Sequence, residues 1–213
     1  MSERAGGSLS TRLRWVLVGL VLVVAAAVAF WPRSQPQPAA APAPDLTALR
    51  AKAALAKCPA PQGGGGAAAK LSGLKVECMA DGSAVDLGAV LGGRPALVNF
   101  WEPWCLPCRD ELKALQDYAA EPGAATVLLV QVPANSDQAS GLDMLAGLGV
   151  HLPSVWDPSG AVAKVLGKPN AFPISYVVDA GGAAHRVLSP AVFTTPDQVR
   201  QAVRQQGNGV ATG

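Results

Sequence analysis

A Cys-Leu-Pro-Cys motif at residues 105–108 constrains the fold more than any other feature of this sequence. The run before it, residues 96–101 (ALVNFW), is continuously apolar, as expected of a buried strand. Residues 106–119 are predicted to form a helix, which places Cys105 at the helix N-terminus. There the helix dipole and the free backbone N–H groups stabilise a thiolate. Cys108 lies one turn further along, close enough to Cys105 for a disulfide.

This spacing predicts thiol–disulfide exchange, in which Cys105 attacks the disulfide of a partner and Cys108 resolves the mixed disulfide. A zinc site and an inert structural disulfide are the alternatives. Structural zinc normally needs four N or S ligands, whereas the remaining cysteines, Cys58 and Cys78, stand twenty residues apart. A CxxC that follows a buried strand favours the redox role. We expect no metal and no dissolved cofactor, because the cysteine pair itself carries the electrons.

From Leu71 onward, predicted strands alternate with predicted helices. The strands are at Leu74–Cys78, 96–101, 126–132, near Val155, 174–179 and 184–189, and the helices at 106–119, 138–148 (capped by Asp137), 159–166 and after Thr194 or Thr195. Turn signals at Asp81-Gly82 and Gly181-Gly182 separate neighbouring strands. Continuous apolar strands between helices predict an α/β fold, with a central sheet covered by helices on both faces.

A segment without charge near the N-terminus, residues 15–31 (WVLVGLVLVVAAAVAFW), predicts that everything after it is exported. As a helix it would span about 26 Å, close to the hydrocarbon core of a bilayer, and a Trp at each end suits the two interfaces. Arg12 and Arg14 precede it, so the positive-inside rule keeps residues 1–14 in the cytoplasm. We favour an uncleaved membrane anchor. The alternative is a signal peptide cleaved after the small residues 27–29.

The segment after the anchor is rich in Pro. Residues 32–44 hold five Pro and are predicted to be a semi-rigid spacer. Asp45 can cap a short helix that runs to about Lys57 and is stopped by Pro59. The predicted order is therefore cytoplasmic N-terminus, anchor, linker, N-terminal helix with a Gly-rich segment, α/β domain and flexible tail (residues 1–14, 15–31, 32–44, 45–70, 71–206 and 207–213).

The distribution of charge excludes one class of function. The net charge of +2 arises before residue 16, where three Arg stand against one Glu, and the rest of the chain is neutral. The body of the chain therefore lacks the basic stretch or face that a nucleic-acid-binding protein needs. We expect no nucleic-acid partner.

Three stretches together resemble the thioredoxin superfamily: WEPWCLPC at 101–108, the LVNF before it, and FPISYVVDAGG at 172–182. The likeness is closer to the membrane-anchored TlpA-like branch, which includes the thiol reductases of cytochrome c maturation. It covers about residues 71–206, with a strand–turn at Leu74–Leu87 and an extra helix–strand segment at about 137–157. The resemblance implies a thioredoxin fold with that central insertion, thiol–disulfide exchange, and a cis-proline facing the CxxC.

The resemblance also implies a role for each residue that matches the family motif. Cys105 matches the nucleophile, Cys108 the resolving thiol, and Trp104 the aromatic residue before the CxxC. Pro173 matches the cis-proline, which would present backbone groups to an incoming chain. Glu111 matches an acidic residue proposed to manage protons near the resolving thiol. The alternative for Glu111 is a solvated residue in an early helical turn, where acidic side chains are favoured anyway.

Two positions depart from the family pattern. Glu102, with Pro103, replaces small residues and adds a negative charge beside the thiols, which should oppose thiolate formation. Asn99 stands where thioredoxins carry a buried Asp. Because Asn cannot take up a proton, that role would pass to Glu111 or to water.

The other two cysteines raise a separate question. If Cys105 pairs with Cys108 in an oxidising compartment, a Cys58–Cys78 disulfide follows, and it would tie the helix at 46–57 to the first strand. The alternative is that one of them is a free or auxiliary redox thiol. His151 and His185 are isolated in the sequence, and we expect surface or capping roles for them rather than copper binding.

We therefore expect an extracytoplasmic, membrane-tethered thiol–disulfide oxidoreductase that reduces cysteine pairs in exported proteins. Its reductant would be relayed by a membrane partner. A disulfide oxidase or isomerase using the same cysteines is one alternative, and a copper-binding or redox-inert interaction domain is another. The direction of exchange depends on the reduction potential, which the surroundings of the thiolate set.

Overall fold

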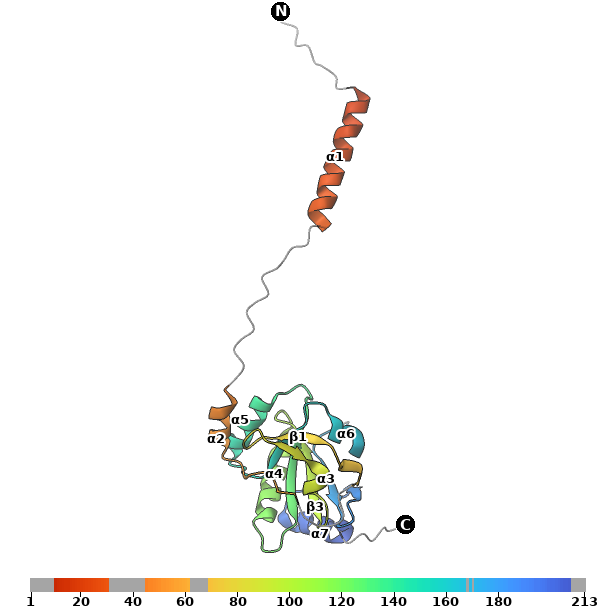
Figure 1. Ribbon diagram of the computed structural model, residues 1–213. Coiled ribbons are helices and arrows are strands. Elements are labelled where there is room, and N and C mark those ends of the chain that lie inside the picture. Colours follow the sequence, from red (N-terminus) through yellow and green to blue (C-terminus); the bar gives the residue numbers. More distant parts are fainter. Residues whose placement is uncertain (1–9, 31–44, 62–68, 168, 170, 208–213) are drawn as a thin grey trace, which may run out of the picture. The chain divides into compact units, whose positions relative to one another are not determined.

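A mixed sheet of seven strands forms the centre of the larger part of the chain (Figure 1). The computed structural model describes residues 10–30, 45–61, 69–167, 169 and 171–207. The chain divides into two units, Met1–Ala43 and Pro44–Gly213, and the sheet belongs to the second.

The described part of the first unit is helix α1, at Thr11–Phe30. It includes most of the predicted anchor, and its apolar side chains from Leu13 to Val24 are exposed. Across the parts of the chain that the structure describes, no helix is both long enough and apolar enough to cross a membrane. Trp31, the predicted linker, the Gly-rich run and residues 208–213 lie outside the described residues.

The sheet has the strand order β2-β1-β5-β4-β3-β6-β7. Strands β3 and β4 pair in parallel, as do β4 and β5, and the remaining pairs are antiparallel. The strands are β1 Lys75–Cys78, β2 Ala84–Asp86, β3 Ala96–Trp101, β4 Thr126–Gln131, β5 Ser154–Trp156, β6 Ile174–Val178 and β7 Ala184–Arg186. The long strand β3 therefore lies inside the sheet, with β4 on one side and β6 on the other.

Helices cover both faces of the sheet, as the alternation of elements predicts (Figure 1). They are α2 Leu46–Ala53, the 3₁₀ turn η1 Ala69–Leu71, α3 Leu87–Val90, α4 Leu106–Ala119, α5 Gln138–Leu148, α6 Ala161–Leu166 and α7 Pro196–Gly207. Leu97 and Trp101 of β3 point into the core shared with α2, α4, α5 and α7. Val98 and Phe100 point into the core shared with η1, α3 and α6. The α/β prediction is confirmed.

Several predicted boundaries agree with the structure. Strand β3 and helices α4 and α5 have the predicted bounds. Asp137 caps α5 by accepting the N–H of Ser140 at 2.8 Å, and Asp45 caps α2 by accepting the N–H of Thr47 at 2.9 Å. Local capping chemistry, which the sequence displays directly, explains this agreement.

The end predicted for α2, the first helix after the linker, is wrong. Helix α2 stops at Ala53 and not near Lys57, because Ala54 adopts the left-handed conformation (φ 47°) and its N–H bonds the carbonyl of Arg50 at 3.0 Å. The N–H of Ala56 then bonds the carbonyl of His151 at 2.8 Å, so the chain after α2 is held by a distant loop. Tertiary contacts, not Pro59, end this helix.

Candidate active site

The two cysteines of the motif are joined in a disulfide at the N-terminus of α4, with their Cα atoms 5.4 Å apart. Cys105 is the N-cap residue, and its Sγ accepts the backbone N–H of Cys108 at 3.2 Å. Both cysteines are buried, with 3% of Cys105 and none of Cys108 exposed. The geometry gives Cys105 the N-cap position and an N–H donor, which stabilise a thiolate.

Trp104 and Phe172 form an apolar rim next to the cysteines. Trp104 is 53% exposed and its indole N–H donates to the carbonyl of Ala134 at 2.7 Å. Its ring meets that of Phe172 edge to face, with centroids 5.6 Å apart. Leu106, the first residue of α4, is also exposed. Exposed apolar side chains beside a reactive group are typical of a surface that binds a partner.

Pro173 is buried, and the peptide bond between Phe172 and Pro173 is cis. Phe100 pairs with Ile174 in the register of β3 and β6, so Pro173 lies beside the end of β3. The chain passes from that end of β3 through three residues to Cys105. Register alone thus brings two segments far apart in sequence, the motif and Pro173, to the same end of the sheet.

Glu111 is buried one turn after Cys108 on α4, with 1% of its surface exposed. Its carboxylate accepts the side-chain amide of Asn99 at 2.8 Å and the backbone N–H of Phe193 at 2.9 Å. Burial raises the pKa of Glu111 to about 7, against the opposing effect of these two hydrogen bonds. Glu111 is therefore not the solvated helix residue of the alternative, and it can exchange a proton near neutral pH.

Glu102 is a second buried carboxyl, three residues before Cys105. Its side chain accepts the backbone N–H of Val132 at 3.3 Å and the hydroxyl of Ser136. Burial raises the pKa of Glu102 to about 7, and the two hydrogen bonds oppose that rise. The sequence predicts a fixed negative charge at Glu102, but in the structure the carboxyl is buried, and its raised pKa favours the protonated form more than in an exposed Glu.

Some groups of the site carry no signal in the sequence. Ala134 and Phe193 contribute only backbone groups, and Ser175 contributes a hydroxyl 2.9 Å from the amide nitrogen of Asn99. Backbone partners can be of any residue type, so only the fold reveals them. Ser175, next but one after Pro173, is the single member that the strand pairing with β3 could have suggested.

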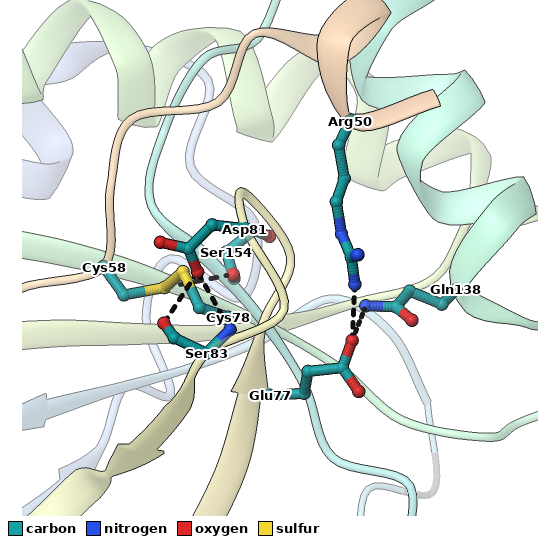
Figure 2. Close-up of a disulfide and its surroundings, with 8 residues drawn as sticks. All are labelled: Arg50, Cys58, Glu77, Cys78, Asp81, Ser83, Gln138 and Ser154. Atoms are coloured by element: carbon teal, nitrogen blue, oxygen red, sulfur yellow. Dashed lines mark hydrogen bonds and ion pairs between the residues drawn. A yellow bond between two sulfur atoms is a disulfide. The ribbon is translucent and has the colours of Figure 1, made fainter. Parts of the chain in front are cut away.

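The second disulfide joins Cys58, in the segment after α2, to Cys78 at the end of β1 (Figure 2). This is the pairing that the sequence predicts. Beside it, the Oε1 atom of Glu77 accepts two hydrogen bonds. One comes from the guanidinium of Arg50 on α2 at 2.6 Å, and the other from the side-chain amide of Gln138 on α5 at 3.0 Å. A covalent bond and an ion pair thus hold the same N-terminal segment to consecutive residues of β1.

The two histidines lie apart from the cysteines of the motif. The Nδ1 atom of His151 is 3.0 Å from the carbonyl oxygen of Ala53, at the end of α2. The Nε2 atom of His185 is 2.9 Å from Asp179, a hydrogen bond that lowers the pKa of that carboxyl. Within the described ranges, no three His, Cys, Asp or Glu side chains gather in a way that could hold a metal ion.

Curated relatives of this chain carry redox names. A thiol:disulfide interchange protein, CycY, of Rhizobium leguminosarum bv. viciae is 36% identical over 95 residues, which cover 44% of this chain and 49% of the relative. The thiol-disulfide oxidoreductase ResA of Oceanobacillus iheyensis is 29% identical over 112 residues, covering 53% and 57%. The chain therefore spans about half the length of these curated relatives.

A solved structure and a family model give the fold and the family. A secreted Mycobacterium tuberculosis disulfide oxidoreductase, described as homologous to E. coli DsbE, superposes with a TM-score of 0.55 at 23% identity, covering 64% of this chain and 98% of that one. This likeness shows a thioredoxin-like α/β fold. The model of the AhpC/TSA family matches residues 66–185, more than half of the chain. The chain belongs to the AhpC/TSA family.

Proposed function

We propose that this protein is an extracytoplasmic, membrane-tethered thiol–disulfide oxidoreductase that reduces cysteine pairs of exported proteins. The observation that carries the proposal is the position of Cys105, which caps α4 and accepts the N–H of Cys108. A sulfur in that position is stabilised as a thiolate by the helix N-terminus. The names of the curated relatives support the same chemistry.

The exchange balances in two steps. The Cys105 thiolate attacks one sulfur of the partner disulfide, forming a mixed disulfide and releasing the other partner sulfur as a thiolate. The Cys108 thiolate then attacks the Sγ of Cys105, which closes the Cys105–Cys108 disulfide and releases the partner as a dithiol. A dithiol donor must next reduce this pair for another turnover, and Glu111 supplies or accepts a proton beside Cys108.

The proposal includes a membrane anchor and a direction of exchange. The uncharged segment at 15–31, with basic residues before it, supports a single span with the domain on the outer side. The electron donor would then be a membrane protein that presents a dithiol on that side. Reduction, and not oxidation, requires a low potential of the CxxC, near −250 mV or below by comparison with known systems.

Trapping tests the proposal directly. Cys108→Ser removes the resolving thiol, so partners should accumulate as dithiothreitol-sensitive adducts on Cys105 in native membranes. Cys105→Ser serves as the matched control and should trap nothing. Absence of adducts on the Cys108→Ser variant would overturn the proposal, and equilibration of the CxxC with a dithiothreitol series would decide the direction.

A further inference from the structure

Two side chains of the loop before Cys105 bind one short segment of the chain. Glu102 accepts the N–H of Val132 and the hydroxyl of Ser136, while the indole of Trp104 donates to the carbonyl of Ala134. All three partners lie between the end of β4 and the start of α5. We call residues 132–136 the β4–α5 loop. The active-site loop is thus fastened to it at two points, one buried and one exposed.

Glu102 is an unusual group for a purely structural fastening. Its carboxyl is completely buried, and none of the ion pairs in the described part of the chain includes it. Burying a carboxylate without a cation is costly, as the raised pKa shows. Two hydrogen bonds stand against that cost, and both are made with residues of the β4–α5 loop.

The hydrogen bonds of Glu102 continue through Ser136 to Gln131, the buried last residue of β4. Ser136 donates to Glu102 and accepts the side-chain amide of Gln131 at 3.1 Å. The same amide donates to the carbonyl of Asp137 at 2.8 Å. A relay from Gln131 through Ser136 to Glu102 therefore fixes both the β4–α5 loop and the loop that carries Trp104.

The β4–α5 loop also contacts the apolar rim of the active site, through the hydrogen bond from Trp104 to Ala134. Trp104 is half exposed, and it stands against Phe172, the residue before Pro173. Beyond Phe172 lies a mostly apolar hollow of about 270 Å³, lined by the β4–α5 loop, Phe172 and residues of α6. If the β4–α5 loop moved, the carbonyl of Ala134 would leave the indole, and the rim and the hollow would change shape together.

We propose that Glu102 and Ser136 are positioning residues that hold the β4–α5 loop and Trp104 as a preformed, apolar docking surface for the polypeptide partner beside Cys105. Neither residue takes part in the sulfur chemistry. The partner class is a polypeptide with an apolar side chain next to its cysteine, because the surface offers an aromatic rim and an apolar hollow. This proposal rests on the proposed exchange activity.

The test compares two substrates on the full-length protein in detergent. Insulin, with dithiothreitol as reductant, is a polypeptide disulfide, and 5,5′-dithiobis(2-nitrobenzoate) is a small disulfide that needs no docking surface. We expect Glu102→Ala and Ser136→Ala to raise the KM for insulin by about tenfold and about threefold, since Glu102→Ala loses one buried and one partly buried hydrogen bond and Ser136→Ala loses only partly buried ones. Their rates with the small disulfide should stay within about twofold of the parent.

Two further variants separate positioning from charge. Glu102→Gln can still accept the N–H of Val132 and can donate to Ser136, so it should restore most of the insulin KM. Asp110→Ala removes an exposed carboxylate that is only two residues from Cys108 and should leave the KM unchanged. A Glu102→Ala KM equal to that of Asp110→Ala, or a Glu102→Gln variant as impaired as Glu102→Ala, would overturn the proposal.

The indole N–H signal of Trp104 gives a readout that is independent of activity. In ¹⁵N-labelled protein, with Trp104→Phe for assignment, the signal should shift and exchange faster in Glu102→Ala and in Ser136→Ala. An unchanged indole signal in both variants would overturn the proposed positioning. If the parent protein exchanged with neither substrate, the proposed function would be wrong. The indole measurement would still test whether Glu102 and Ser136 position Trp104.

Discussion

The two disulfides of this protein differ in almost everything except the bond itself. Cys105–Cys108 closes a single helical turn, beside two buried carboxyls and an exposed aromatic rim. Cys58–Cys78 joins residues that are 20 apart and ties the N-terminal segment to a buried strand end, next to an ion pair. The first disulfide constrains very little of the chain but has the surroundings of a reactive thiol. The second constrains a longer loop and lacks those surroundings. The comparison teaches that surroundings and loop length, not the presence of sulfur, separate a redox pair from a fastening.

The largest expected effect is on turnover. Cys105→Ser should lower the rate of insulin reduction by at least about a thousandfold, because no other thiol caps a helix at the end of the sheet where Pro173 lies. The Cys58→Ser, Cys78→Ser double variant should keep most of the parent rate. Turnover measured at equal concentrations of folded protein checks both. Loss of turnover in the double variant without loss of folding would assign Cys58 and Cys78 to the redox pathway and remove the distinction.

The next effect concerns the carboxyls that mark the redox region. Unfolded, a Glu loses its proton near 4.5, whereas folded Glu102 and Glu111 keep theirs until about 7. Between these values the unfolded chain binds fewer protons, so the free energy of unfolding should fall as pH rises from 4.5 to 7 and then level off. Each carboxyl contributes up to about 3 kcal/mol to that fall.

Urea unfolding of the oxidised protein at pH 5 and pH 8 measures this fall. Glu102→Gln and Glu111→Gln should each flatten it, and the two changes together should remove most of it. The control is Asp110→Asn, which removes an exposed carboxyl on α4, the helix that carries Glu111. It should leave the pH dependence as it is in the parent. A parent protein whose stability rises with pH across this window, with no change in Glu102→Gln and Glu111→Gln, would contradict the raised pKa of both carboxyls.

Comparison of the two regions also shows how far the sequence can lead. The spacing of Cys105 and Cys108 after an apolar strand is a local pattern, and it was enough to predict the strand, the helix and the pairing. Cysteine parity predicted Cys58–Cys78. The burial of Glu102 could not be predicted, because its partners come from Val132 and Ser136, which only the parallel pairing of β3 with β4 brings near.

The same limit explains the wrong helix end. A Pro at position 59 is a local stop signal, and the sequence offered nothing nearer. The actual end at Ala53 depends on His151, whose backbone carbonyl binds Ala56 and whose ring meets the carbonyl of Ala53. Both contacts join residues about a hundred positions apart, so a local sequence pattern cannot predict them.

The third effect is on stability and belongs to the second disulfide. Closing a loop of 20 residues restricts the unfolded chain, so the Cys58→Ser, Cys78→Ser variant should lose about 2–4 kcal/mol of the free energy of unfolding. Opening the Cys105–Cys108 bond by Cys108→Ser should cost much less, because its loop is only one turn. Urea unfolding at one pH compares the two. Equal losses would mean that loop length does not set the difference.

The smallest expected effect is on stability and comes from the ion pair between Arg50 and Glu77. Arg50 and Cys58 hold this segment to Glu77 and Cys78, which are adjacent in β1 (Figure 2). While the disulfide is closed, the segment cannot leave β1, so Arg50→Met should cost only about 0.5–1 kcal/mol, as expected of a partly exposed ion pair. Without the disulfide, the ion pair and the packing of α2 on α5 are what remain, and the same substitution should cost more.

A double-mutant cycle in urea measures the coupling between the disulfide and the ion pair. Lys52→Met is the matched control, since Lys52 makes its ion pair with exposed Asp143 on α5 and not with β1. Additive losses for Arg50→Met and the cysteine variant would show that the disulfide and the ion pair act on separate parts of the fold.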